Sequence, residues 1–252
     1  MQNQQPSTLK EIRVHGTQDF PCAFYQTGTR IKGNMVKHHW HEEVELLYFS
    51  GGEFCLEVNM ERFNISEECF YVINPGELHS ISVEKNGGCV ENAVVFHMDM
   101  LSSAYALDQI QTNLIQPVQN GSIQFPRCLR KNEPAFEPVR KSYEEIRNVF
   151  GGDSFRENYY DGEAVTDDIT RQLFIKSALL RTLAVRSTNN LFEVTEKNHD
   201  HRIETIKTTL TYIQENYKEK IYIRDLAGLI GMNEQYFCRF FKKVIGLSLI
   251  HI

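Results

Sequence analysis

Four residues in the N-terminal half have the types and the spacing of a metal or ligand site. His39, His41 and Glu45 lie in a G-x5-H-x-H-x3-E-x6-G pattern, and His79 follows shortly after Pro75-Gly76. On a strand, positions 39, 41 and 45 share parity, so their side chains point to one face, and His79 can approach from a neighbouring strand. Imidazole nitrogens and a carboxylate oxygen suit Zn, Fe, Mn or Ni. The donor set is compatible with a divalent metal, but we expect no bound cofactor; these groups can instead bind a small ligand or hydrogen-bond as polar residues of the core.

Aromatic residues surround this pattern in the sequence. Trp40, Tyr48, Phe49 and Tyr71 can line a pocket, because aromatic rings stack well on sugar rings, or they can be ordinary core residues. We include Tyr48 with the three histidines and Glu45 in the predicted ligand-binding set.

A second group, in residues 221–246, has the spacing of a helix-turn-helix. A small residue, Ala227, lets two helices cross closely, and Gly231 supplies the positive φ that ends the first helix. Asn233 can cap the second helix by accepting a backbone N–H. Three aromatic residues then follow at helical spacing and can pack on the first helix: Phe237, Phe240 and Phe241.

The second helix of this motif leaves polar side chains for an outward face. The predicted DNA-contacting residues are Gln235, Cys238, Arg239, Lys242 and Lys243. The forked donors of Arg239 match guanine O6 and N7, and Gln235 can pair with adenine. The two lysines are better suited to phosphates, which give affinity without sequence information. The alternative is an ordinary α-hairpin whose charges are solvated.

The elements that must position these groups differ between the two halves of the chain. The first hundred residues contain short aromatic and β-branched runs separated by Gly, Pro and Asn turns, which predicts a sandwich or barrel. From about Pro138 the apolar spacing becomes helical, with predicted helices over 139–150, 166–187 and 203–217. The 166–187 helix is opened by Thr166, Asp167 and Asp168, and its apolar stripe packs either on its own barrel or on a second copy. That stripe consists of Ile169, Leu173, Phe174, Leu180 and Leu183.

Composition restricts the class of protein further. The 252 residues are 41% hydrophobic and 24% charged, which is typical of a globular protein. We expect no membrane span and no signal peptide, and the six scattered cysteines fit reduced thiols in the cytoplasm. The net charge is −6, but residues 200–252 hold eight Lys and Arg against six Asp and Glu, so a DNA contact would be confined to that end.

The C-terminal motif resembles the first helix-turn-helix of AraC-type transcription regulators. The resemblance is carried by Asp225-Leu226-Ala227, Gly231-Met232-Asn233, Tyr236-Phe237-Cys238-Arg239-Phe240-Phe241-Lys242-Lys243 and Gly246. In that family the positions matching Gln235, Cys238 and Arg239 face bases. The family has two such motifs, whereas this sequence continues only through Leu247 to Ile252, so we expect weakened DNA affinity.

The N-terminal pattern resembles the first cupin motif, and AraC-type sensor domains resemble cupins. The expected fold is α+β, a cupin-like β-barrel followed by linker helices and an all-α helix-turn-helix segment. The predicted boundaries are 1–135 for the sensor, 136–187 for the helical packing region, 188–200 for the linker and 201–252 for the DNA-binding part.

The resemblance implies a cytoplasmic, homodimeric regulator rather than an enzyme. Its partners would be double-stranded DNA and a small effector such as a sugar. Two alternatives stay open: a metal-dependent cupin enzyme, and a ligand-binding dimerisation module without productive DNA binding.

Overall fold

A computed structural model describes residues 10–11, 13–29, 31–86, 89–105, 107–151, 168–189, 192–194 and 201–245, with the side chains at 89, 201–203, 214 and 243–245 outside that description. The chain divides into two compact units. The larger comprises residues 13–37 and 41–197, and the smaller comprises 198–252 with the short segments 1–12 and 38–40. None of the described helices is both long and apolar enough to cross a membrane.

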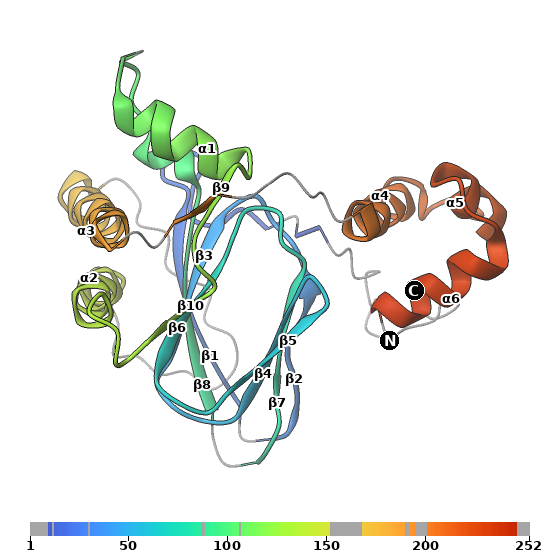
Figure 1. Cartoon of the computed structure of the whole chain (residues 1–252), viewed down its shortest axis with the longest axis horizontal. Coiled ribbons are helices and arrows are strands. Elements are labelled where there is room, and N and C mark those ends of the chain that lie inside the picture. Colours follow the sequence, from blue (N-terminus) through green and yellow to red (C-terminus); the bar gives the residue numbers. More distant parts are fainter. Residues whose placement is uncertain are drawn as a thin grey trace. The chain divides into compact units, whose positions relative to one another are not determined.

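The larger unit is built on two antiparallel sheets that enclose a barrel-like core (Figure 1). The five-stranded sheet has the order β1 (Cys22–Thr29), β8 (Cys89–Phe96), β3 (Val44–Phe49), β6 (Cys69–Ile73) and β10 (Cys128–Arg130). The four-stranded sheet has the order β2 (Gly33–His39), β7 (His79–Val83), β4 (Phe54–Val58) and β5 (Glu61–Ile65). The expected α+β class, with a cupin-like N-terminal barrel followed by helices, is confirmed.

Both faces of the five-stranded sheet are covered. Leu47, Phe49 and Ile73 face the other sheet, whereas Leu46 and Phe70 face the helices. This two-sided burial explains why β3 and β6 are almost continuously apolar rather than alternating.

Helices cover the outer face of this sheet. α2 (Phe136–Val149) and α3 (Ile169–Thr188) lie on the same side of the strands in Figure 1 and contribute Tyr143, Ile175 and Leu179 to the outer core. The side chain of Asp168 caps α3 by accepting from the N–H of Thr170 at 2.9 Å, as predicted, while Thr166 and Asp167 lie outside the described residues.

Short elements that the sequence pattern did not predict complete the larger unit. They are η1 (Met98–Leu101), the π-helical turn η2 (Gln111–Ile115), α1 (Gln116–Gln119), β9 (Ile123–Gln124) and β11 (Glu193–Val194). β11 pairs with β9, so part of the segment predicted as linker is paired to the sensor domain.

The smaller unit contains three helices at its C-terminal end. They are α4 (His201–Asn216), α5 (Ile223–Leu229) and α6 (Glu234–Ile245). Ile206, Leu226, Phe237 and Phe241 are buried and form its apolar interior.

Candidate functional site

The predicted histidine site forms at a corner of the chain rather than along one strand. β2 ends at His39 and β3 begins at Val44, so the strand-parity argument for His39, His41 and Glu45 does not apply. The corner is joined to the Pro-Gly turn, because the N–H of Gly76 donates to the carbonyl of His41 at 2.7 Å. The H-x-H-x3-E segment and the Pro75-Gly76 turn before His79 therefore meet through a backbone hydrogen bond.

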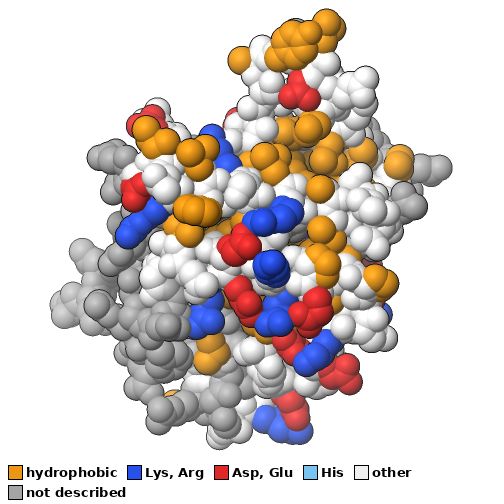
Figure 2. Space-filling model, turned by 90° about the vertical axis from the view of Figure 1, so that its left-hand side faces the viewer, with side chains coloured by type: hydrophobic (Ala, Val, Ile, Leu, Met, Phe, Trp, Pro, Cys, Tyr) orange, Lys and Arg blue, Asp and Glu red, His pale blue; other side chains and the backbone are white. Residues whose placement is uncertain are grey.

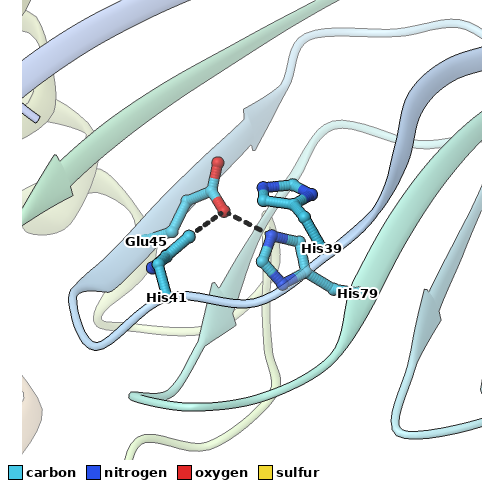
Figure 3. Close-up of side chains that lie close together, drawn as sticks. All are labelled: His39, His41, Glu45 and His79. Atoms are coloured by element: carbon cyan, nitrogen blue, oxygen red, sulfur yellow. Dashed lines mark hydrogen bonds and ion pairs between the residues drawn. The ribbon is translucent and has the colours of Figure 1, made fainter. Parts of the chain in front are cut away.

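Three side chains of the larger unit converge there (Figure 3). The ligand atoms of His41, Glu45 and His79 lie within 4.8 Å of one another. His41, Glu45 and His79 belong to the larger unit and are buried. The segment 38–40 is grouped with the smaller unit, and there His39 Nε2 lies 3.4 Å from Glu11 Oε2.

The carboxylate of Glu45 is the centre of this group. Its Oε2 lies 3.0 Å from Nε2 of His79 and 3.4 Å from Nε2 of His41. Burial alone would raise the pKa of this carboxyl, but hydrogen bonds and charge from His41 and His79 hold the pKa of Glu45 well below its ordinary value. Glu45 is thus a buried anion paired with two buried imidazoles.

The geometry of His79 suits a metal ligand. Its Nδ1 lies 2.9 Å from the carbonyl oxygen of Glu77, which can only accept, so Nδ1 carries the proton. Nε2 then faces the carboxylate of Glu45 at 3.0 Å. A backbone carbonyl that fixes Nδ1 is the usual support of a histidine bound to a metal through Nε2. The donor set and its spacing therefore fit a divalent ion.

A buried polar network holds the turn that presents His79. Glu77 is 6% exposed, and its carboxylate accepts two hydrogen bonds from the guanidinium of Arg127 and one from the N–H of Asn74 at 2.7 Å. Asn59 donates to the same carboxylate at 3.2 Å. Asn74 also accepts from the N–H of Phe125 at 2.8 Å, so the turn is tied to the segment before β10. Sequence reasoning missed Arg127, because it lies about fifty residues beyond its partner.

Another missed residue is Glu91 on β8. It pairs with Phe49 in the ladder and is 2% exposed, and its Oε1 has no hydrogen-bond partner in the described part of the chain. Burial, with a smaller contribution from the charge of Glu45, raises the pKa of Glu91 well above its ordinary value. The only sequence signal was a charged residue at an inward position of an apolar strand.

Tyr48 does not join the predicted ligand set. It lies three residues after Glu45 on β3, so it points to the opposite face. There its ring packs against Phe70 and Tyr143, and its hydroxyl donates to Glu68 at 2.6 Å. The prediction for Tyr48 is corrected by this alternation. Phe49 and Tyr71 do face the barrel interior, where they pack as core residues.

The turn between α5 and α6 forms as its residue types predict. Gly231 has φ +66°, its N–H donates to the carbonyl of Gly228 at 3.2 Å, and the N–H of Met232 donates to the carbonyl of Ala227 at 2.9 Å. This is a Schellman ending for α5. Asn233 caps α6 by accepting from the N–H of Tyr236 at 2.8 Å.

α6 separates a buried face from an exposed one. Phe237 and Phe241 are fully buried, while Phe240 is half-buried and stacks on the exposed ring of Tyr236. On the other face Gln235, Arg239 and Lys242 are exposed and Cys238 is half-buried. The side chain of Lys243 and all of Gly246 lie outside the described residues.

Comparison with known proteins finds matches to the barrel and to most of the chain. Residues 27–147, which span β2 to α2 and include the histidine site, match the family model of the AraC-like ligand binding domain. This match is to the barrel, which is similar to the ligand-binding domains of AraC-type proteins. The AraC-type resemblance seen in the sequence is thereby confirmed, and the barrel is a cupin-like ligand-binding domain.

One relative extends the match beyond the barrel. YdeC of Bacillus subtilis (strain 168), an uncharacterised HTH-type transcriptional regulator, is 25% identical over 246 residues. The match covers 94% of this chain and 76% of YdeC.

Solved structures match parts or most of the chain at low identity. ToxT from Vibrio cholerae is 12% identical, with 92% of this chain and 78% of ToxT covered and a TM-score of 0.40. A predicted oxalate decarboxylase from Thermotoga maritima is 24% identical, with 29% of this chain and 64% of that chain covered and a TM-score of 0.28. Both TM-scores are below 0.5, so neither likeness bears on function.

Proposed function

We propose that this AraC-type chain is a ligand-responsive, DNA-binding regulator in which α6 enters the major groove and the barrel binds a small effector. The observation that carries the proposal is the construction of α6. Its buried face is anchored by Phe237 and Phe241, its start is capped by Asn233, and its outward face presents Gln235 and Arg239. A DNA-binding role also implies a cytoplasmic location.

The outward side chains have different roles in this proposal. Arg239 and Gln235 lie one turn apart, since Nε of Arg239 lies 3.4 Å from the carbonyl oxygen of Gln235. They are placed to contact base edges, with Cys238 between them against a thymine methyl or a sugar. Lys242 lies nearer the end of α6, where a cation contacts phosphate. Lys243 is assigned to phosphate by its position in the sequence.

Selection from a random double-stranded library at low salt tests this proposal. The full chain is expected to enrich a short motif. Arg239→Ala should remove discrimination at one position, worth about 1–3 kcal/mol, whereas Lys242→Ala should weaken binding to all sequences and reduce the salt dependence by about one ion. Arg171→Ala, at the exposed start of α3, is the control and should change neither.

If no motif is enriched, or if Arg239→Ala leaves the preference unchanged, base recognition by α6 is wrong. Binding that is uniformly weak would favour the alternative of a ligand-binding module without productive DNA contact.

For the effector we propose a small polyhydroxylated molecule, such as a sugar, bound beside Glu45. A buried carboxylate with two imidazoles offers acceptors and donors for hydroxyl groups, in a barrel whose interior also contains the apolar side chains of Leu47, Phe49 and Ile73. A melting-temperature screen of the full chain against sugars is the test. A binding sugar should raise the Tm of the wild type and of Glu61→Gln, an exposed residue of β5, but not that of Glu45→Gln. The absence of any shift would remove the support for a sugar.

The same cluster supports a second proposal, a bound divalent ion. His41, Glu45 and His79 would hold it, with His39 as the fourth candidate. Such an ion would polarise a ligand oxygen, and these side chains would orient it. Elemental analysis of purified protein should find about one ion per chain, and His79→Ala should lose it. Metal that persists in His79→Ala would contradict the assignment. We give the barrel a sensing role rather than a catalytic one.

We also propose that the chain forms a homodimer through α3. Ile169, Leu173 and Leu180 are 71%, 61% and 41% exposed, and they repeat at steps of four and seven residues on one side of the helix. Figure 2 shows hydrophobic side chains gathered on the upper part of this face, whereas charged side chains of both signs lie below them. A regular apolar stripe is typical of a helix–helix seam. Leu183 differs, because it packs inward on the barrel.

A further inference from the structure

Two cysteines face one another at the edge of the five-stranded sheet, away from the residues used so far. β10 is the edge strand and pairs antiparallel with β6. Cys128 lies opposite Tyr71, and Cys69 lies opposite Arg130. These four positions share parity, so their side chains project from the same face, and the two cysteines form a diagonal pair.

The pair lines a small open pocket. The pocket has a volume of about 120 Å³ and is also lined by Asn64 of β5 and by Glu67 of the turn that joins β5 to β6. Cys69 is 6% exposed, and Cys128 is half-buried. Both cysteines therefore belong to the wall of one pocket.

The surroundings of the two thiols shift their pKa values in opposite directions. Interaction with the thiol of Cys69 lowers the pKa of Cys128 to about 7, although burial opposes this, and the hydroxyl of Tyr71 and the charge of Arg130 lower it further. Interaction with Cys128, and burial, raise the pKa of Cys69.

We propose that Cys69 and Cys128 form a binding site for a soft, thiophilic metal or metalloid centre that bridges the two sulfurs. Thiolates select such centres, as distinct from the harder ions that suit the nitrogen and oxygen donors around Glu45. The proposal rests on the geometry of the sheet edge and is independent of the effector and DNA proposals.

The diagonal arrangement favours a bridging centre over a disulfide. Diagonal neighbours in an antiparallel pair have Cα atoms about 7–8 Å apart, whereas a disulfide requires about 4.4–6.8 Å. A bridging centre adds a metal–sulfur bond of about 2.3 Å on each side, so it spans the wider separation without moving the strands. Occupation would clamp β10 to β6.

Phenylarsine oxide tests the site in the reduced full-length chain. Its hydrated form, C6H5As(OH)2, reacts with two thiols to give C6H5As(SR)2 and two waters, with arsenic staying trivalent. The wild type should bind one arsenical per chain and lose two of its six thiols when the remainder are titrated in denaturant. Peptide mapping should place the adduct on Cys69 and Cys128.

Single variants decide the assignment. Cys128→Ser is the main variant. Cys69 is more buried, so Cys69→Ser is expected to disturb the packing more. Melting curves of both variants verify that they fold. Losing one of two linked sulfurs should weaken arsenical binding by about 100-fold or more. Cys238→Ser, which alters a half-buried cysteine of α6, should bind like the wild type.

A second arm uses Cu(I) under anaerobic conditions in competition with a chelator. One Cu(I) per chain is expected, with the same loss in Cys128→Ser. Retention of all six thiols by the wild type, or uptake of arsenical or Cu(I) by Cys128→Ser at the wild-type affinity, would overturn the proposal.

Discussion

Replacing Arg127 by Met tests whether the Glu77 network holds the histidine site. The guanidinium of Arg127 donates to both oxygens of the Glu77 carboxylate and to the carbonyl of Val72. The side chains of Arg127 and Glu77 are 24% and 7% exposed, so the substitution leaves a carboxylate in the interior without its cation. Met has a similar length and removes only the charge and the donors.

The expected loss is large because the pair is buried. Removing one partner of a buried ion pair costs about 3–5 kcal/mol. For a unit of this size each kcal/mol corresponds to roughly 2–4 °C in Tm, so the transition of the larger unit should fall by roughly 6–20 °C. Calorimetry at pH 7 measures this shift. The backbone carbonyl of Glu77 also accepts from Nδ1 of His79. Arg127→Met should therefore bind metal or sugar more weakly than the wild type at temperatures where both are folded.

Two further variants test whether the loss of stability comes from the buried Arg127–Glu77 ion pair itself. Arg127→Met combined with Glu77→Gln removes the stranded charge, so the double variant should recover a substantial part of the loss. Arg62→Met breaks the exposed ion pair with Glu57 and should leave the Tm nearly unchanged. A fall of less than about 2 °C for Arg127→Met, or no recovery in the double variant, would refute the reasoning.

Three other predictions follow from burial and backbone geometry. Burial raises the pKa of Glu91 above its unfolded value of about 4.5, so its stabilising contribution is present below pH 4.5 and is lost as the pH rises toward the folded value. Glu91→Gln should therefore raise the Tm more at pH 7.5 than at pH 5, and an equal shift at both would contradict the assignment. Gly231→Ala should destabilise the C-terminal helices by about 1–2 kcal/mol, because Gly231 has φ +66°, which an alanine adopts only at a cost. The added Cβ would meet open space, so no steric clash contributes to this loss. Gly228→Ala, in open space within α5, is the matched control and should stabilise by up to about 1 kcal/mol; equal signs in urea unfolding would count against this account. Leu173→Glu should shift sedimentation toward the monomer, whereas Arg171→Glu, at an exposed position outside the stripe, should have a smaller effect; an unchanged dimer in Leu173→Glu would exclude α3 as the seam.

The helix-turn-helix was predictable from the sequence because its geometry depends on local residue types. Gly231 must adopt positive φ, Asn233 must accept from a nearby N–H, and Ala227 must be small, and each requirement involves neighbours within five residues. The assignment of buried and exposed faces on α6 succeeded for the same reason.

The residues of the histidine site could be predicted from the sequence, but the backbone arrangement that brings them together could not. His41, Glu45 and His79 meet because a corner and a Pro-Gly turn are joined by a backbone hydrogen bond, which spacing alone does not encode. Tyr48 was misplaced because its distance from Glu45 is odd, and strand alternation then sends the two side chains to opposite faces. Arg127 and the partner strand β10 depend on contacts between distant segments, so no local pattern indicates them.

The two-sided burial of β3 has a consequence for how quickly a ligand can enter. β3 is paired on both edges, with β6 and β8, and covered on both faces, so its amide protons should exchange only when the whole unit unfolds. Glu45 lies on this strand, but His41 lies in the corner before it, outside any strand ladder. Entry and exit of a ligand should therefore follow local opening at residues 41–43. Residence times should track the exchange rates of that corner and not the global stability of the barrel.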